Sequence, residues 1–125
     1  MSELQESGQM YLETILVLSG KMEHVRSIDV CKYMGFSKPS VSRAMSLLKR
    51  DEYIDINEAG YITLTQKGHD VADSIYERHT LFTKVLEMIG VPEEIAEQDA
   101  CKIEHYVSEE TVKAVKRAIE KYQNE

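Results

Sequence analysis

Long hydrophobic runs are missing from this sequence, and their absence excludes one broad class of protein. No apolar stretch approaches the ~18–20 residues that a membrane-spanning helix needs. The first residues, MSELQESGQMYLE, are acidic and polar, without the basic start and apolar segment of a secretory signal. We therefore expect a cytoplasmic protein.

Cysteine is also scarce, and the motifs of common enzyme classes are absent. The two cysteines, Cys31 and Cys101, form no CxxC pair, so a disulfide framework is not expected in a cytosolic chain. Cys31 lies among apolar residues and is expected in the core. The sequence offers no phosphate-binding loop and no nucleophile–base motif, so we expect no enzyme.

The charge is distributed unevenly along the chain. The 125 residues carry a formal net charge of −7. The stretch from Lys21 to Arg50 nevertheless holds seven basic residues and only two acidic ones, Glu23 and Asp29. A basic island on an acidic chain suits a local contact with nucleic-acid phosphates. The acidic remainder could repel DNA or hold cations.

The first half of the sequence has the pattern of a winged helix-turn-helix. Helical periodicity predicts a helix over residues 9–18, a short second helix over 27–34 ended by Gly35, and a third helix that Ser37 can cap. Residues 53–64 alternate and contain the turn residues Asn57 to Gly60, which predicts a two-stranded hairpin. A hairpin directly after a helix-turn-helix is a wing.

The second half is predicted to be helical. A long helix should run from Thr65 or Gln66 to about Met88, a second from Pro92 to about Tyr106, and a last one from its cap at Ser108. The predicted fold is therefore mainly α with a small β-hairpin. It would comprise a winged helix-turn-helix DNA-binding domain over residues 1–72 and a helical dimerisation and metal-binding domain over 73–125.

The candidate DNA-reading residues gather at the start of the third helix, since recognition helices enter the major groove by their N-terminal end. Arginine can donate two hydrogen bonds to guanine, while lysines suit phosphates. The candidates are Arg26, Ser37, Lys38, Pro39, Ser40, Ser42, Arg43 and Lys49. The alternative is an ordinary solvated helix face, although its many serines are poor helix formers.

A candidate metal site lies near the end of the chain. Cys101, Glu104 and His105 have the spacing that puts three donors on one helix face, as a surface helix with one buried cysteine also would. His79 and the Met10–Glu13 pair are further candidates, although they could be a surface histidine and a core methionine. A mixed nitrogen, oxygen and sulfur set suits Fe(II), Co(II), Ni(II) or Zn(II), whereas pure carboxylates favour Mn(II) or Mg(II).

The sequence resembles the diphtheria toxin repressor family of metal-dependent regulators over essentially its whole length. The resemblance lies in MYLETI, SKPSVSRAMSLLKRDEYI, LTQKG, ERHTLFTKVLEMIGV and DACKIEHYVS. It implies a repressor of metal-homeostasis genes with Fe(II) as its co-repressor, because iron members carry Met and Cys at positions 10 and 101. The implied principal site is Met10, Cys101, Glu104 and His105. His79 would belong to an ancillary site, with Glu13 as a possible extra ligand.

The chain also departs from the iron pattern of the family. Thr83 stands where iron members place a glutamate ligand, and Glu97 stands where they place a histidine, although Glu97 could still coordinate. The sequence ends at residue 125 without the SH3-like domain, a short form that resembles the manganese branch. Mn(II) is therefore the alternative co-repressor, and the ancillary site could be built from His79, Glu97 and Glu13 or be missing.

The expected mechanism is a metal that ties the first helix to the C-terminal helices. Such a metal would hold the two DNA-binding domains of a homodimer at the spacing of the half-sites in an inverted-repeat operator. The dimer surface is expected among Leu81, Val85, Leu86, Ile89 and Ile95, which could instead pack within one subunit. Two other classes remain open: a metal-independent winged-helix regulator with an organic ligand, and a metalloenzyme or metal buffer.

Overall fold

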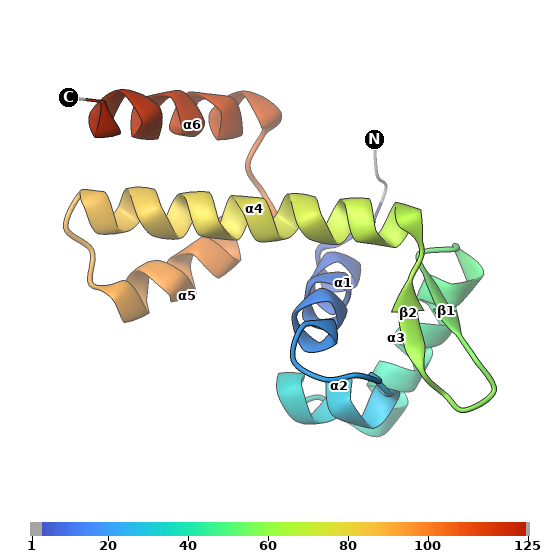
Figure 1. Ribbon diagram of the computed structural model, residues 1–125. Coiled ribbons are helices and arrows are strands. Elements are labelled where there is room, and N and C mark those ends of the chain that lie inside the picture. The colour runs from blue at the N-terminus through green and yellow to red at the C-terminus, as the bar shows by residue number, and fades with distance from the viewer. Residues whose placement is uncertain (1–3, 125) are drawn as a thin grey trace. The chain divides into compact units, whose positions relative to one another are not determined.

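The computed structural model describes residues 4–124 and divides into two compact units, one up to Asp73 and the other from Ser74 onward. Figure 1 shows the order of the elements. They are α1 (Glu6–Ser19), α2 (Ser27–Met34), α3 (Lys38–Arg50), β1 (Ile54–Ile56), β2 (Ile62–Leu64), α4 (Gln66–Met88), α5 (Glu93–Ile103) and α6 (Glu109–Gln123). The predicted fold class, mainly α with one hairpin, is confirmed. The predicted domain boundary at 72/73 stays a prediction.

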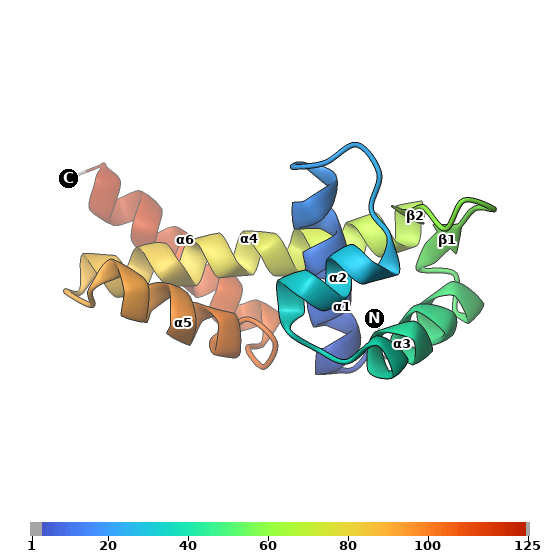
Figure 2. The ribbon, with the colours of Figure 1, turned by 90° about the horizontal axis from the view of Figure 1, so that it is seen from below.

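The first three helices form a helix-turn-helix in which α1 packs on α2 and α3 (Figure 2). Gly35 ends α2 in the left-handed conformation, with φ at +74°. Because glycine has no Cβ, it adopts this conformation without steric strain. Ser37 then caps α3, its hydroxyl oxygen accepting a hydrogen bond from the backbone N–H of Ser40 at 3.3 Å. The predicted stop of α2 and start of α3 are both confirmed. At α1 the prediction was too short, since the helix already begins at Glu6.

The wing is a two-stranded antiparallel hairpin in which Ile54 pairs with Leu64 and Ile56 with Ile62. Asn57 builds its turn, because Oδ1 accepts hydrogen bonds from the N–H groups of Ala59 at 3.0 Å and Tyr61 at 2.9 Å. A further bridge joins Val25 to Ile62, so the segment before α2 lies along the outer side of β2. The hairpin is thereby attached to the helix-turn-helix.

One apolar core holds the first unit together. It is built from one face of each element and includes the first turns of α4. Its fully buried members are Leu12, Ile15, Val30, Val41, Ile54 and Ala72. Cys31 is 8% exposed and belongs to this core, as its apolar surroundings in the sequence predicted.

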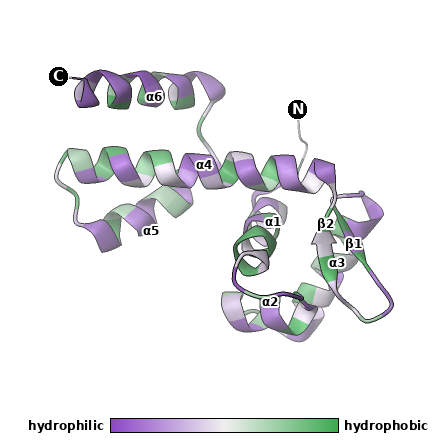
Figure 3. Cartoon of the chain, viewed as in Figure 1, coloured by the Kyte–Doolittle hydropathy of each residue, from purple (hydrophilic) through white to green (hydrophobic). Residues whose placement is uncertain are grey.

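The second unit consists of α4 from Ser74 on, α5 and α6, and it has its own smaller core. Phe82, Ala100 and Val112 bring one apolar side chain from each of the three helices into it. Ser108 caps α6 by accepting from the N–H of Thr111 at 3.2 Å, as predicted. Figure 3 shows polar and apolar residues alternating along α6, the pattern of a helix with one covered face.

The end of α5 differs from the prediction. The helix was expected to reach about Tyr106, but it ends at Ile103, with Glu104 still in helical backbone conformation and residues 104–106 in a turn. The reason is a contact with a residue far away in the sequence. Arg78 donates hydrogen bonds to the carbonyl oxygens of Glu104 and Val107, which therefore do not take part in a continued α5 helix.

Among the described residues, no helix is both long enough and apolar enough to cross a membrane.

Candidate metal centre and nucleic-acid interface

The second unit brings two histidines to one buried carboxylate. The side chain of Glu104 is fully buried, and its Oε2 lies 2.9 Å from Nδ1 of His79. Its Oε1 lies 3.4 Å from Nε2 of His105, whose side chain is also fully buried. His79 is 26% exposed at its side chain and keeps some access to solvent. The structure thus collects one oxygen-donor and two nitrogen-donor side chains at the start of the turn after α5.

These three residues have the donor chemistry of a divalent metal site. Oε1 of Glu104 is buried and accepts no hydrogen bond among the described residues. A buried carboxylate oxygen without a hydrogen-bond donor is costly, and a bound cation removes that cost. Neutral imidazole and carboxylate together suit the middle of the first-row divalent series as well as Mn(II). The residues present therefore fit a metal ion.

His79 lies beside the carboxylate of the predicted principal site. The family resemblance implied that it belongs to a neighbouring ancillary site, and this assignment stays a prediction. In the structure His79 is an immediate neighbour of Glu104, on α4.

Two other predicted ligands, Cys101 and Glu97, lie less favourably for such a site. Cys101 is exposed on α5, and Glu97 is exposed one turn before it. Within the described part of the chain, neither belongs to any close trio of histidine, cysteine and carboxylate donors. Met10 and Glu13 are half-buried on α1, in the first unit. The metal-binding roles of all four residues stay predictions.

Arg78 is a structural neighbour of this site that sequence reasoning missed. Its Nη1 donates hydrogen bonds to the carbonyl oxygens of Glu104 at 3.3 Å and Val107 at 3.1 Å. Its Nη2 donates to Oε1 of Glu109 at 2.8 Å. Arginine suits this task because its planar fork presents several donors at once. The guanidinium therefore fixes the backbone on both sides of His105.

The predicted DNA-reading residues all lie on the outside of the first unit. Val41, Met45 and Leu48 direct one face of α3 into the core, which leaves the other face for solvent. Eight candidates are exposed: Arg26, Ser37, Lys38, Pro39, Ser40, Ser42, Arg43 and Lys49. Pro39 sits in the first turn of α3, where a missing N–H costs no hydrogen bond. The arrangement offers an accessible helix N-terminus with cations around it.

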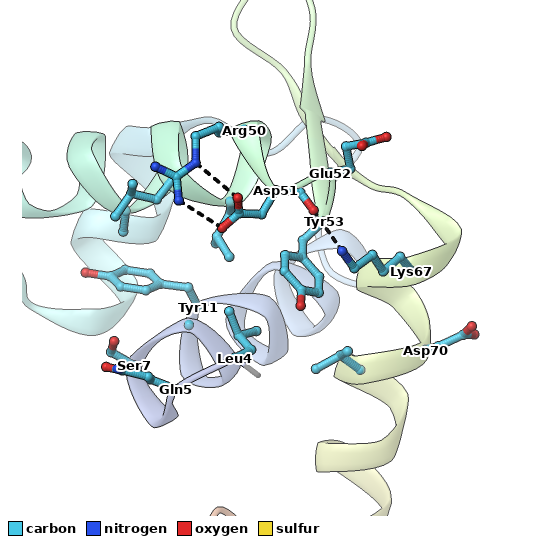
Figure 4. A pocket seen from close by; sticks show the side chains of 15 residues that line it. Leu4, Gln5, Ser7, Tyr11, Arg50, Asp51, Glu52, Tyr53, Lys67 and Asp70 are labelled. Carbon is cyan, nitrogen blue, oxygen red and sulfur yellow. Dashed lines mark hydrogen bonds and ion pairs between the residues drawn. The ribbon is translucent and has the colours of Figure 1, made fainter. Parts of the chain in front are cut away.

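The first unit also contains a pocket (Figure 4). It lies between the start of α1, the end of α3 and the start of α4. Arg50 is ion-paired with Asp51 at 3.0 Å, and Lys67 donates to the carbonyl of Asp51 at 3.0 Å while lying over the ring of Tyr53. Both cations in the pocket lining are thus engaged by neighbouring residues of the protein itself.

Comparison with known proteins finds matches over both units. Residues 3–69 match the family "Iron dependent repressor, N-terminal DNA binding domain", and residues 65–125 match "Iron dependent repressor, metal binding and dimerisation domain". The transcriptional regulator MntR of Escherichia coli O6:H1 is 32% identical over 112 residues, which cover 90% of this chain and 72% of that protein. The iron-dependent repressor IdeR of Mycobacterium bovis is 31% identical over 111 residues, 88% of this chain and 48% of that one.

A solved structure supports the fold assignment. The manganese regulator SloR superposes with a TM-score of 0.79 at 24% identity, covering 90% of this chain and 53% of that chain. The present chain therefore spans about half the length of SloR and of IdeR. At this level of identity the likeness concerns the fold alone.

Proposed function

Because the chain belongs to the iron dependent repressor family, we propose that it is a metal-dependent, DNA-binding transcriptional repressor that acts as a homodimer. The observation that carries the proposal is the fully buried carboxylate of Glu104, whose Oε2 faces His79 and whose Oε1 faces His105. Its Oε1 has no hydrogen-bond donor among the described residues, and a bound cation would offset the cost of burying it. The exposed, basic N-terminal end of α3 supports the DNA-binding half of the proposal.

The proposed ligands are Glu104, His79 and His105 first, with Met10, Cys101, Glu13 and Glu97 as additional donors. When bound, a metal would supply positive charge that neutralises Glu104. The ligand-bearing residues would then hold one arrangement of their segments, and the population of conformations would shift toward the one that binds operator DNA, provided that this conformation binds the metal better. Coupling of about 1–3 kcal/mol would change operator affinity roughly 5- to 150-fold.

The identity of the metal has two candidate answers, each supported by a different observation. Sulfur donors from Met10 and Cys101 would favour Fe(II), which we propose as the physiological co-repressor. The three neighbouring side chains in the second unit, however, provide only nitrogen and oxygen, and Cys101 is exposed. A site of nitrogen and oxygen donors alone suits Mn(II) as well as Fe(II), and Mn(II) is therefore the second candidate.

The proposed homodimer would use apolar side chains that the second unit leaves uncovered. Ile89 is 73% exposed at the end of α4, and Ile95 is 46% exposed on α5. Leu81 and Val85 instead pack partly against the core of their own unit. We propose that Ile89 and Ile95 lie at the dimer contact, while Leu81 and Val85 serve the subunit core.

A single titration tests the function and the metal together. Binding to an operator duplex, selected from random sequence, is measured anaerobically with Fe(II), Mn(II), Co(II) and Zn(II), and the bound metal is counted. We expect that the unaltered protein binds only with metal, and that metal no longer promotes binding in Glu104→Gln and His105→Ala, although the dimer stays folded. Operator binding that is indifferent to a chelator would refute the proposal and favour a metal-independent regulator.

The variants Met10→Asp and Cys101→Ser test, in the same assay, whether sulfur ligands decide the preference between Fe(II) and Mn(II). If sulfur ligation selects Fe(II), Met10→Asp shifts the preference toward Mn(II). An unchanged preference in both variants would remove Met10 and Cys101 from the ligand set, and the preference of the unaltered protein would then decide between Fe(II) and Mn(II).

A further inference from the structure

A cluster beside the turn of the wing consists of the half-buried Tyr61 and the exposed His24 and Arg26. The rings of His24 and Tyr61 stack, with centroids 4.1 Å apart and planes inclined by 4°. Nη2 of Arg26 donates a hydrogen bond to the hydroxyl oxygen of Tyr61 at 3.3 Å. The guanidinium carbon of Arg26 lies 4.8 Å from the centroid of the same ring. A cation held over the face of an aromatic ring is attracted by the negative charge of that face.

Strand geometry explains why these three side chains meet. Val25 bridges to Ile62, whose N–H donates to the carbonyl of Val25 at 2.7 Å, and both residues point into the core. Successive side chains of an extended segment point to opposite sides. His24 and Arg26 flank the buried Val25, and Tyr61 precedes the buried Ile62. The side chains of these three neighbours therefore lie together on the side that faces away from the core.

The charge of Arg26 is not neutralised within the cluster. Glu23 is paired with His24 at 3.7 Å, and Asp29 accepts from the backbone N–H of Arg26, not from its guanidinium. Across the described residues, no carboxylate forms an ion pair with the Arg26 side chain. The guanidinium is thus oriented by a ring and a hydroxyl but keeps its full charge and its remaining donors for an outside anion.

We propose that Tyr61, backed by the stacked ring of His24, is a positioning residue that holds Arg26 for a contact with the phosphate backbone of double-stranded DNA. The inference rests on the proposed DNA-binding function. Arg26 precedes α2, and Tyr61 directly precedes β2, the returning strand of the wing, so the cluster joins the two parts of the first unit that flank α3 in the sequence. Fixing the side chain before DNA binds removes rotamer entropy that a free arginine would lose on contact.

A double-mutant cycle on the full chain tests the proposal. The probe is a short fluorescein-labelled duplex of arbitrary sequence, because phosphate contacts do not depend on sequence. Anisotropy is recorded over a range of salt concentrations, with saturating Mn(II) and with chelator. We expect Arg26→Gln to reduce the logarithmic salt slope by about 0.9 per bound subunit. Tyr61→Leu should weaken binding in the same direction.

The decisive comparison is Tyr61→Leu in two backgrounds, the unaltered chain and the Arg26→Gln variant. If Tyr61 acts through Arg26, the substitution weakens binding in the unaltered chain and changes nothing in the Arg26→Gln variant. Equal losses in both backgrounds would overturn the positioning role while leaving DNA binding intact. Absence of duplex binding by the unaltered protein would instead overturn the proposed function, and the inference with it.

Two further variants keep the cycle interpretable. Tyr61→Phe retains the stacked ring and removes only the hydroxyl that accepts from Arg26, so it serves if Tyr61→Leu fails to fold. It should show a smaller loss that again vanishes in the Arg26→Gln background. Tyr122→Leu is the matched control, because Tyr122 is 62% exposed on α6 in the other unit and its replacement should leave the salt slope unchanged.

Discussion

Nη2 of Arg78 lies 2.8 Å from Oε1 of Glu109, so an arginine on α4 is ion-paired with the first turn of α6. The same guanidinium holds the carbonyl oxygens of Glu104 and Val107 through Nη1. Its side chain is only 15% exposed, which limits competition from water. Arg78 thus fastens both ends of the turn that carries His105.

Replacing Arg78 with alanine should lower both stability and metal affinity. The buried carbonyl groups would lose charge-assisted hydrogen bonds, which are worth about 1.5–3 kcal/mol for a charged donor. We expect a loss of about 2 kcal/mol in the free energy of unfolding of the metal-free protein, from the same range. Metal binding should weaken as well, because Glu104 and His105 would be less well ordered. Urea unfolding and metal titration measure the two effects separately.

Glu109→Gln is the matched control for that substitution. Glu109 is 68% exposed, and its ion pair with Arg78 should contribute under about 1 kcal/mol. It leaves the two carbonyl contacts in place, so metal affinity should stay close to that of the unaltered protein. If Arg78→Ala were no more harmful than Glu109→Gln, the carbonyl contacts would have no role in ordering the site.

The sequence predicted the elements whose signals are local. Gly35, Ser108 and the Asn57 turn act on backbone groups within a few residues, so a local pattern was enough to place them. The start of α1 was missed because Gln5 gives no side-chain cap to mark it. The family resemblance, drawn from motifs in both halves, predicted the winged helix-turn-helix and the helical second half.

The arrangement of the candidate metal centre depends on contacts that no local pattern reveals. Arg78 meets its partners 26 to 31 residues further along the chain. The spacing of Cys101, Glu104 and His105 predicted one helix face, but α5 ends at Ile103 and leaves Cys101 exposed. The proximity of His79 to Glu104 follows from helix packing, which sequence periodicity alone does not give.

Gly68 offers a test of close backbone packing in the first unit. A Cβ placed on Gly68 would clash with the carbonyl oxygen of Tyr53, a backbone atom that cannot move away cheaply. Alanine normally favours a helix over glycine by about 1 kcal/mol. Here the clash should dominate, and we expect Gly68→Ala to destabilise the protein by about 1–3 kcal/mol in thermal or urea unfolding.

Gly20→Ala supplies the comparison for Gly68→Ala. Gly20 has φ of −82°, and an added Cβ would meet its nearest heavy atom, the carbonyl oxygen of Val17, at an ordinary 3.5 Å. Reduced freedom of the unfolded chain should then stabilise the protein by about 0.4–1 kcal/mol. Stabilisation by both substitutions would show that the helix start at Gly68 can shift away from the Tyr53 carbonyl.

Tyr11 should make the stability of the first unit fall in alkaline solution. Burial raises the pKa of the Tyr11 hydroxyl above its ordinary value of 10.0, and the nearby Cys31 thiolate raises it further. The ring also packs edge-on against Phe36, with centroids 6.0 Å apart. The folded protein therefore keeps Tyr11 neutral at pH values where the unfolded chain has already ionised it.

The sign of the effect follows from proton binding. Above pH 10 the folded state holds more protons than the unfolded state, so the free energy of unfolding declines as pH rises through the folded-state pKa. Below pH 10 both states hold the proton, and the contribution is complete. Tyr11→Phe removes the ionisable group while keeping the ring against Phe36. The free energy of unfolding of both proteins is measured in urea between pH 8 and 11.5, a range chosen about the tyrosine pKa of roughly 10. The two curves of this free energy against pH should converge as pH falls. The Tyr11→Phe variant should lose less stability in alkaline solution. Parallel curves throughout would mean that Tyr11 is as free to ionise in the folded protein as in the unfolded chain.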